Sequence, residues 1–260
     1  LQGGAANDTL NGGDGIDRAD YSSSLAGVNV NLATNTANDG LGGTDTLSNI
    51  EEILGSGFND SLTGNTGNNF FIGGAGNDTI DGGAGVDRVS YSTSTAAVIV
   101  NLGTGSATDG LGGTDTLRNI EDVTGSGFND SLTGNAGSNI FIGGAGNDTI
   151  DGGDGTDRVD YSSSAAAVVV NLATGTANDG IAGGTDTLLN IEDIIGSNFN
   201  DSLTGNAGNN LFVGGPGNDT IDGADGIDRI DYSSSTAGVT VNLATGTASD
   251  GFGGSDSLTN

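Results

Sequence analysis

One nine-residue pattern, Gly-Gly-x-Gly-x-Asp-x-apolar-x, restricts the fold of this chain more than any other feature. Clear copies are GGAGNDTID at 73–81 and 143–151, each followed directly by a second copy. Four nonapeptides run without a gap over 55–90, 125–160 and 196–231, and two more occupy 3–20, so that fourteen fit the frame. Self-similarity at a fixed short period indicates a solenoid, in which each coil packs only on its neighbours.

The composition of the nonapeptide predicts a tight turn followed by a short strand. Glycine adopts positive φ without steric cost, so the first six residues can turn and the last three can extend. Two nonapeptides then complete one coil, and the apolar eighth residue points inward. These inward positions are Leu62, Phe71, Ile80 and Val89, then Leu132, Phe141, Ile150 and Val159, then Leu203, Phe212, Ile221 and Ile230. One inward side chain per strand predicts a thin core.

A longer period lies above the nonapeptide. The segment 58–65 recurs at 128–135 and 199–206, in steps of 70 and 71 residues, and the extra residue of the second step lies near Ala182. We therefore expect one continuous repeat solenoid over 1–260, made of a partial repeat 1–54, large repeats 55–124 and 125–195, and a partial repeat 196–260. The chain starts without methionine and stops in mid-repeat, so we expect it to be a piece of a longer protein.

Each large repeat also contains a spacer of about 34 residues, for example 91–124. Val98, Val100 and Leu102 alternate with other residues in a period of two, which predicts a strand. Residues 110–118 resemble a degenerate nonapeptide, with Asp115 in the sixth place and Leu117 in the eighth. We expect further, less regular coils here, and no helix of ordinary length anywhere, because turn residues interrupt every candidate window.

The charge balance is strongly acidic. The chain has 34 acidic residues and five basic ones, a formal net charge of −29. Nucleic acids and anionic membrane surfaces are disfavoured as partners, whereas divalent cations are favoured. Histidine and cysteine are absent, which removes the usual zinc ligands, the Ser-His and Cys-His nucleophile pairs, and disulfides. No stretch approaches the roughly 20 apolar residues that span a bilayer.

The spacing of the aspartates predicts metal sites in the turns. Stacked coils lie about 4.8 Å apart, so turns of nonapeptides n and n+2 face each other and bring their sixth residues to one gap. Two carboxylates there repel unless a cation lies between them. Calcium suits such a gap because it accepts six to eight oxygens in flexible geometry, whereas magnesium demands a tight octahedron. A thin, glycine-rich fold also needs the free energy that bound ions supply.

Stacking pairs Asp60 with Asp78, Asp130 with Asp148, and Asp201 with Asp219. On the other edge Asp87, Asp157 and Asp228 face Asn69, Asn139 and Asn210, a weaker arrangement. Eleven of the fourteen nonapeptides carry Asp in the sixth place, although a turn alone would accept Asn, Ser or Gly. The predicted metal ligands are Asp8, Asp17, Asp60, Asp78, Asp87, Asp130, Asp148, Asp157, Asp201, Asp219 and Asp228, with Asp45, Asp115, Asp186 and Asp256 added from the spacers.

Several positions leave two interpretations open. The stacking partners of the four spacer aspartates do not follow from the sequence. Glu51, Glu121 and Glu192 are either ligands or partners of stacked arginines. We favour neutralisation of carboxylates over a ladder for anionic substrates as the role of the arginines at 18, 88, 158 and 229. We favour packing over stacking against sugars as the role of the tyrosines at 21, 91, 161 and 232.

The nonapeptides, together with the linking phrase Asn-Ile-Glu-(Asp/Glu)-x-x-Gly-Ser-x-Phe-Asn-Asp-Ser-Leu-Thr-Gly-Asn, resemble the RTX or haemolysin-type calcium-binding family of exported bacterial proteins. The resemblance implies an all-β fold, a right-handed parallel β-roll or β-helix solenoid with Ca²⁺ in the turns. It also implies a chain that is disordered in low calcium, leaves through a type I secretion channel, and folds outside the cell. The regular spacer departs from the minimal β-roll, and no C-terminal export signal is visible.

The expected function is a non-catalytic, calcium-binding extracellular scaffold, such as the stalk of an adhesin or a subunit of a surface layer or filament. Near-identical tandem repeats suit extension and self-association through exposed strand edges. The alternative is a module that aids the export of a catalytic domain outside this chain (an epimerase, protease or lipase) or binds extracellular polysaccharide. Ice binding by a threonine face is disfavoured, because threonine forms no consistent column in the turns.

Overall fold

The computed structural model describes residues 1–180 and 184–260, and there every regular element is a strand. The all-β prediction and the absence of helices are confirmed for these residues, none of which forms an apolar helix long enough to cross a membrane. The insertion expected near Ala182 lies outside the described residues. Two compact units divide the chain, Leu1–Gly127 (unit 1) and Phe128–Asn260 (unit 2). A single continuous solenoid stays a prediction.

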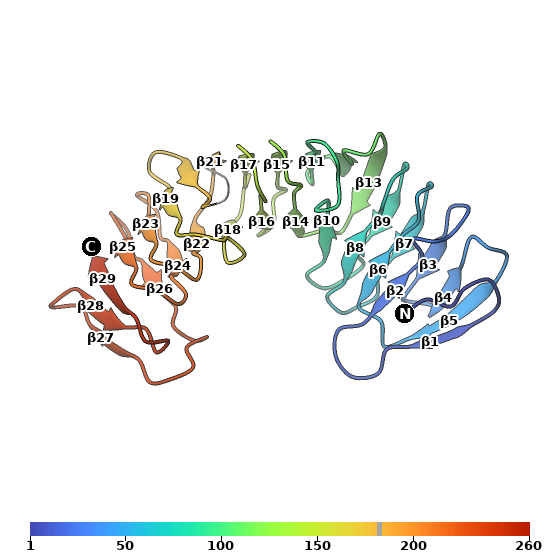
Figure 1. Ribbon diagram of the computed structural model, residues 1–260. Helices are drawn as coiled ribbons and strands as arrows, with labels where there is room; N and C mark the ends of the chain where they lie inside the picture. Colours follow the sequence, from blue (N-terminus) through green and yellow to red (C-terminus); the bar gives the residue numbers. More distant parts are fainter. Residues whose placement is uncertain (181–183) are drawn as a thin grey trace. The chain divides into compact units, whose positions relative to one another are not determined.

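Unit 1 consists of two layers of strands, here called sheet A and sheet B (Figure 1). Sheet A has the order β1 (Thr9–Asn11), β5 (Thr44–Ser48), β4 (Thr36–Asn38), β3 (Asn29–Asn31), β7 (Ser61–Thr63), β9 (Thr79–Asp81), β13 (Thr114–Arg118), β12 (Ser106–Thr108) and β11 (Ile99–Asn101). Sheet B has the order β2 (Arg18–Asp20), β6 (Glu52–Leu54), β8 (Phe70–Ile72), β10 (Arg88–Ser90) and β14 (Asp122–Thr124).

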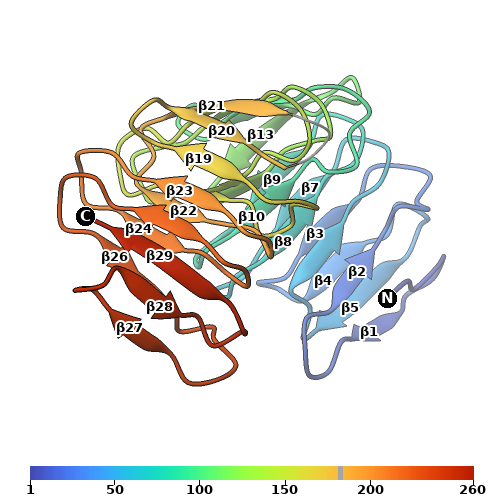
Figure 2. The same ribbon diagram turned by 60° about the vertical axis from the view of Figure 1, so that its left-hand side comes forward.

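Unit 2 repeats this plan, and Figure 2 brings it forward. Its sheet A contains β15 (Ser131–Thr133), β17 (Thr149–Asp151), β21 (Thr185–Leu189), β20 (Thr176–Asn178), β19 (Val169–Asn171), β23 (Ser202–Thr204), β25 (Thr220–Asp222), β29 (Ser255–Thr259), β28 (Thr247–Ser249) and β27 (Thr240–Asn242). Its sheet B contains β16 (Ile140–Ile142), β18 (Arg158–Asp160), β22 (Asp193–Ile195), β24 (Leu211–Val213) and β26 (Arg229–Ile230).

The pairing register follows from the nonapeptide. Leu62 of β7 pairs in parallel with Ile80 of β9, and Phe71 of β8 pairs with Val89 of β10. Each pair joins the eighth residues of nonapeptides n and n+2, because alternate nonapeptides supply sheet A and sheet B. The parallel β-roll expectation is therefore confirmed within each unit.

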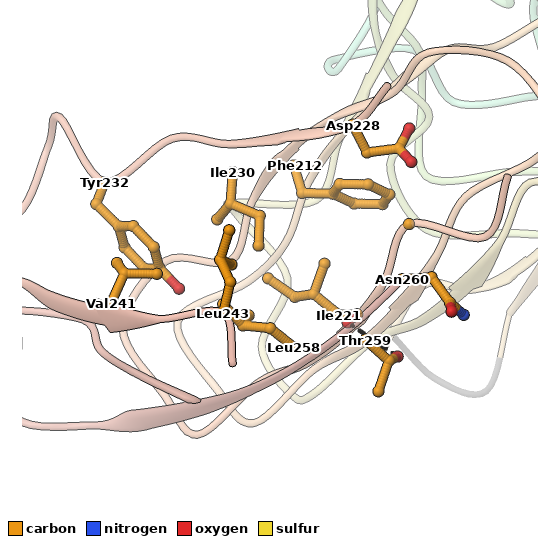
Figure 3. A pocket seen from close by; sticks show the side chains of 11 residues that line it. Phe212, Ile221, Asp228, Ile230, Tyr232, Val241, Leu243, Leu258, Thr259 and Asn260 are labelled. Carbon is orange, nitrogen blue, oxygen red and sulfur yellow. Dashed lines mark hydrogen bonds between the residues drawn. The ribbon is translucent and has the colours of Figure 1, made fainter. Parts of the chain in front are cut away.

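The core is the predicted single file of apolar residues. The eighth residues from Leu62 to Ile221 are all fully buried or nearly so. Ile230 is the exception and is only partly buried. It lines a pocket of about 270 Å³ together with Phe212, Tyr232 and Leu243, where the apolar side chains face one another (Figure 3). Here β27 has no neighbour on its outer side within unit 2, so Val241 and Leu243 stay exposed.

The spacer departs from the expected parallel coils. Its first strand, β11, runs antiparallel to β12, and β12 runs antiparallel to β13, so the chain doubles back twice within sheet A. Gly105, with φ of +67°, lies in the turn that makes the first reversal possible. The degenerate nonapeptide is confirmed, because Leu117 pairs in parallel with Ile80. Val98 and Val100 are buried, as their period of two predicts.

Candidate metal centres at the turns

Aspartates at the beginning of strands of sheet A, either just before the strand or at its second residue, form stacks joined by hydrogen bonds, which we call A ladders. In unit 1 the backbone N–H of Asp60 donates to Asp78 Oδ1 at 2.8 Å, and that of Asp78 donates to Asp115 Oδ1 at 3.0 Å. The same spacing joins Asp8 to Asp45, Asp130 to Asp148 and Asp186, and Asp201 to Asp219 and Asp256. The structure thus brings together the predicted A-edge pairs and gives the spacer aspartates the stacking partners that the sequence left open.

Residues that precede the strands of sheet B form B ladders. The N–H of Asn69 donates to Asp87 Oδ1 at 2.7 Å, and the N–H of Asp87 donates to Glu121 Oε2 at 2.9 Å. Equivalent contacts join Asn139 to Asp157 and Glu192, Asn210 to Asp228, and Asp17 to Glu51. Each full ladder therefore has three members, of which the middle one is always a nonapeptide aspartate.

Within the full ladders, the middle aspartates differ from the end members in their hydrogen bonding. Oδ2 of Asp78, Asp148 and Asp219 in the A ladders, and of Asp87 and Asp157 in the B ladders, is buried and accepts no hydrogen bond. By contrast, Asp60 has both oxygens occupied, Oδ1 by the Val28 N–H and the Ser56 hydroxyl and Oδ2 by the Ser56 N–H. Asp201 is held in the same way by Val168 and Ser197. Buried carboxylate oxygens without donors are costly and indicate an external cation.

Raised pKa values mark the same aspartates. Burial, with the charges of Asp115, Asp60 and Asp109 adding to it, raises the pKa of Asp78 to about 7. Burial and neighbouring carboxylates likewise raise the pKa of Asp148 and Asp219 to about 7 and that of Asp157 to about 6. Without a counter-ion these carboxylates resist ionisation at neutral pH, and a bound cation removes that penalty.

Backbone carbonyls reach the same gaps because glycines leave room for them. A Cβ on Gly74 would collide with the carbonyl oxygen of Ser56, and one on Gly76 would collide with the carbonyl of Phe58. Both glycines have positive φ, +101° and +128°. Among the described residues no three acidic side chains converge on one point, so such carbonyls would complete a calcium shell.

The tyrosines pack and also tether the spacer aspartates. Tyr91 is buried and donates its hydroxyl to Asp115 Oδ2 at 3.0 Å. Tyr21, Tyr161 and Tyr232 donate in the same way to Asp45, Asp186 and Asp256. Each spacer aspartate thus accepts an N–H on one oxygen and a phenol on the other. The packing interpretation holds for Tyr21, Tyr91 and Tyr161, which are buried.

Three of the four recurring arginines pair with carboxylates, as favoured, but their partners are not the glutamates that the sequence left open as one alternative. Arg88 pairs with Asp122 at 3.1 Å, Arg158 with Asp193 at 3.0 Å, and Arg18 with Glu52 at 2.6 Å. One residue earlier, Glu51, Glu121 and Glu192 instead accept the backbone N–H groups of Asp17, Asp87 and Asp157. Strand alternation explains the shift, since β6, β14 and β22 register Glu52, Asp122 and Asp193 opposite the arginines.

Sequence reasoning missed four buried aspartates, Asp39, Asp109, Asp179 and Asp250. Their signal is recurrence, since they follow one another at 70, 70 and 71 residues, directly before the glycine that opens the degenerate nonapeptide. Asp109 Oδ1 accepts the N–H groups of Leu111 and Gly113. Although burial acts to raise it, the pKa of Asp39 is lowered by the backbone N–H groups of Leu41 and Gly43.

The donor set fits calcium. The candidate ligands named above are oxygens of carboxylates and carbonyls, and the chain has no histidine or cysteine to favour a softer metal. The residues that would hold the ions are the middle aspartates of the ladders, with carbonyls from the stacked turns. Their role as metal ligands stays a prediction.

Comparison with protein families agrees with this geometry. The RTX calcium-binding nonapeptide repeat model matches four times, over residues 1–19, 54–89, 124–159 and 195–230. The chain belongs to the RTX calcium-binding nonapeptide repeat family. The matched segments contain the nonapeptide blocks and omit the spacers, so the spacer strands β3 to β5, β11 to β13, β19 to β21 and β27 to β29 lie outside the family pattern. A comparison with curated proteins finds no match.

This RTX chain is thus a calcium-binding repeat region, and the family's repeat solenoid is a structural fold that is not catalytic in itself.

Proposed function

We propose that this RTX region folds around calcium outside the cell, after type I secretion, and serves as a scaffold such as the stalk of an adhesin or part of a surface layer or filament. The observation that carries the proposal is the buried, donor-free Oδ2 at the centre of each full A ladder. In the calcium-free state these carboxylates oppose folding, and calcium reverses their effect.

The charge of the chain supports a calcium-controlled transition. A net charge of −29 keeps the calcium-free chain extended by self-repulsion. Calcium outside the cell both lowers this charge and joins stacked turns. The chain therefore becomes ordered when it moves from the cell to the exterior. Glycine-rich turns and a core one side chain thick give little independent stability.

The repeat architecture supports a scaffold. Large repeats of nearly identical sequence extend the sheets by the same strand pairings each time, as Leu62 with Ile80 and Leu203 with Ile221 show. Repeats of this kind are suited to building a long, stiff molecule. The enzyme-linked alternative is distinguished by the full-length gene, where an adjoining catalytic domain would favour a module and further repeats favour a scaffold.

The test is a calcium titration of chelator-treated protein, followed by far-ultraviolet circular dichroism and by sedimentation, with magnesium as the control ion. We expect a cooperative gain of β signal with calcium alone, and growth in particle size as copies associate. A full β spectrum in chelator would contradict calcium-controlled folding. A folded chain that stays monomeric at all concentrations would contradict self-association and leave the calcium-dependent fold standing.

A further inference from the structure

The spacer aspartate Asp109 has one carboxylate oxygen whose role the turn does not explain. Oδ1 caps the turn by accepting the N–H groups of Leu111 at 2.8 Å and Gly113 at 2.7 Å. Oδ2 is buried and accepts no hydrogen bond, and the residue is 0% exposed. Neither ion pair within unit 1 includes Asp109. A turn cap alone needs only one oxygen, so the second one calls for a ligand.

Stacking brings this oxygen to the nonapeptide turn 73–78. A Cβ on Gly113 would collide with the carbonyl oxygen of Gly76 and lie 2.7 Å from Asp109 Oδ2. The carbonyl and the carboxylate therefore lie on the same side of Gly113. Two residues further on, the N–H of Asp78 donates to Asp115, which fixes the two turns directly over each other.

Asp78 brings a second donor-free oxygen to this junction. It is 1% exposed, and its Oδ2 accepts no hydrogen bond. A Cβ on Gly73, the first residue of the same turn, would collide with that oxygen, so it lies over the turn and away from solvent. The nonapeptide turn and the spacer turn that stacks on it thus each contribute one buried carboxylate oxygen without a donor, and the nonapeptide turn adds the Gly76 carbonyl.

The arrangement recurs in two other spacers. Gly43 faces the carbonyl of Ala6 and Asp39 Oδ2, and Gly254 faces the carbonyl of Gly217 and Asp250 Oδ2. The backbone N–H groups of Ala6 and Gly217 also lie near these two carboxylates and act to lower their pKa. The nonapeptide partners there are Asp8 and Asp219, whose Oδ2 atoms are also buried without a hydrogen-bond donor. Asp39, Asp109 and Asp250 are separated by one and by two large repeats, which argues for a role that the large repeats share.

We propose that Asp109 is a calcium ligand that joins Asp78 and the Gly76 carbonyl in a junction site, and that Asp39 and Asp250 do the same with Asp8 and Asp219. The inference rests on the proposed calcium-dependent fold and extends it to residues outside the nonapeptide. A junction ion fastens each antiparallel spacer to the parallel coils, so that a large repeat folds as one body.

Asp109→Asn tests the assignment in the full chain. Asparagine keeps an oxygen for the turn cap but removes the charge from the junction. Asp14→Asn is the control, because it removes the same charge from an exposed turn residue. Bound calcium is counted by native mass spectrometry after reloading, and circular dichroism in saturating calcium checks folding. We expect Asp109→Asn to bind one ion fewer than the parent and Asp14→Asn to match the parent.

Terbium gives a second readout. It replaces calcium at oxygen sites and is excited through nearby tyrosines, and the four tyrosines of this chain, which has no tryptophan, all contact spacer aspartates. Asp109→Asn should lower tyrosine-sensitised emission, and Asp14→Asn should not. If Asp109→Asn fails to fold, Asp250→Asn takes its place, because Asp250 belongs to the spacer whose strand β27 is exposed.

The outcomes separate the two claims. An unchanged ion count and unchanged emission in a folded Asp109→Asn chain would overturn the junction site and leave Asp109 as a turn cap. A parent chain that binds no calcium would overturn the proposed function itself.

Discussion

At the scale of single residues, aspartates in the same place of the nonapeptide differ in their hydrogen bonding. Asp60 and Asp78 both occupy the sixth place of a nonapeptide, yet Asp60 has donors on both oxygens and Asp78 has a buried oxygen with none. The difference comes from the second residue of the nonapeptide. Asp60 follows Ser56, whose hydroxyl and N–H occupy the carboxylate, whereas Ala75 and Gly74 in the next turn offer no hydroxyl.

Asp78→Asn should therefore weaken calcium binding and stabilise the calcium-free chain at once. The substitution removes a carboxyl group whose pKa is raised by burial to about 7. The calcium-free fold therefore no longer bears the free-energy cost of ionising a buried carboxylate. We expect the calcium midpoint of folding to rise by about tenfold, as for a lost charged contact to the ion, while β signal in chelator increases. The measurement is a calcium titration followed by circular dichroism.

The control for that experiment is Asp81→Asn, which removes the same charge from β9 on the outer face of sheet A, where the carboxylate contacts Asn119. A midpoint shift of equal size in both variants would mean that only net charge matters.

At the scale of elements, much of the fold could be predicted and the spacer could not. The sequence of each nonapeptide determines its own turn and its inward residue, so the register of Leu62 with Ile80 follows from the sequence. The reversal at β12 does not, because Ser106–Thr108 has no inward residue larger than Ala107 and its direction depends on neighbouring strands. For the same reason Asp115 was predicted as a ligand without its partner, and Asp109 was missed.

The inward eighth residues should carry most of the packing energy. Phe71 is 0% exposed, whereas Phe58, which lies in a turn, is 46% exposed. Phe71→Ala should destabilise the calcium-loaded chain by about 3–5 kcal/mol, the usual cost of deleting a buried phenylalanine. Phe58→Ala should change stability by no more than about 0.5 kcal/mol. Urea unfolding at saturating calcium measures both, and similar losses would show that the core is not where the eighth residues meet.

Stacked turns require glycine for space as well as for φ. Gly74 and Gly13 have similar φ, +101° and +90°, but only at Gly74 would a Cβ collide with a carbonyl, that of Ser56. Both alanine variants bear the strain of positive φ, about 1 kcal/mol. Gly74→Ala should lose a further 1–3 kcal/mol or so from overpacking, seen as a lower urea midpoint in calcium. Equal losses at the two sites would contradict the close stacking of turns.

At the scale of the whole molecule, carboxylates make folding depend on pH as well as on calcium. Burial raises the pKa of Asp78, Asp148 and Asp219 to about 7, and that of Asp115, Asp157 and Asp186 to about 6, from an ordinary value of 3.8. A raised pKa means that the folded state holds protons which the unfolded state has released. The contribution of these protonated carboxyl groups to the stability of the folded state is complete below pH 3.8 and is lost as pH rises through 6 to 7.

In the absence of calcium, acidification from pH 8 to pH 5 should thus increase β structure. The measurement is circular dichroism of metal-free protein across this range, with the same series in saturating calcium as a control, where the signal should vary much less. A metal-free chain that is equally structured at both pH values would mean that these carboxylates are not buried together.

Calcium-dependent stacking of the turns stands or falls on the position of the ions. We would grow crystals of the chain in calcium and locate the metal by its anomalous scattering. We expect calcium about 2.3–2.6 Å from Oδ2 of the middle aspartates, Asp78, Asp148 and Asp219 among them, which is the normal distance for an oxygen ligand. Density showing those oxygens bound only to water or to protein donors, with calcium elsewhere or absent, would contradict calcium-dependent stacking.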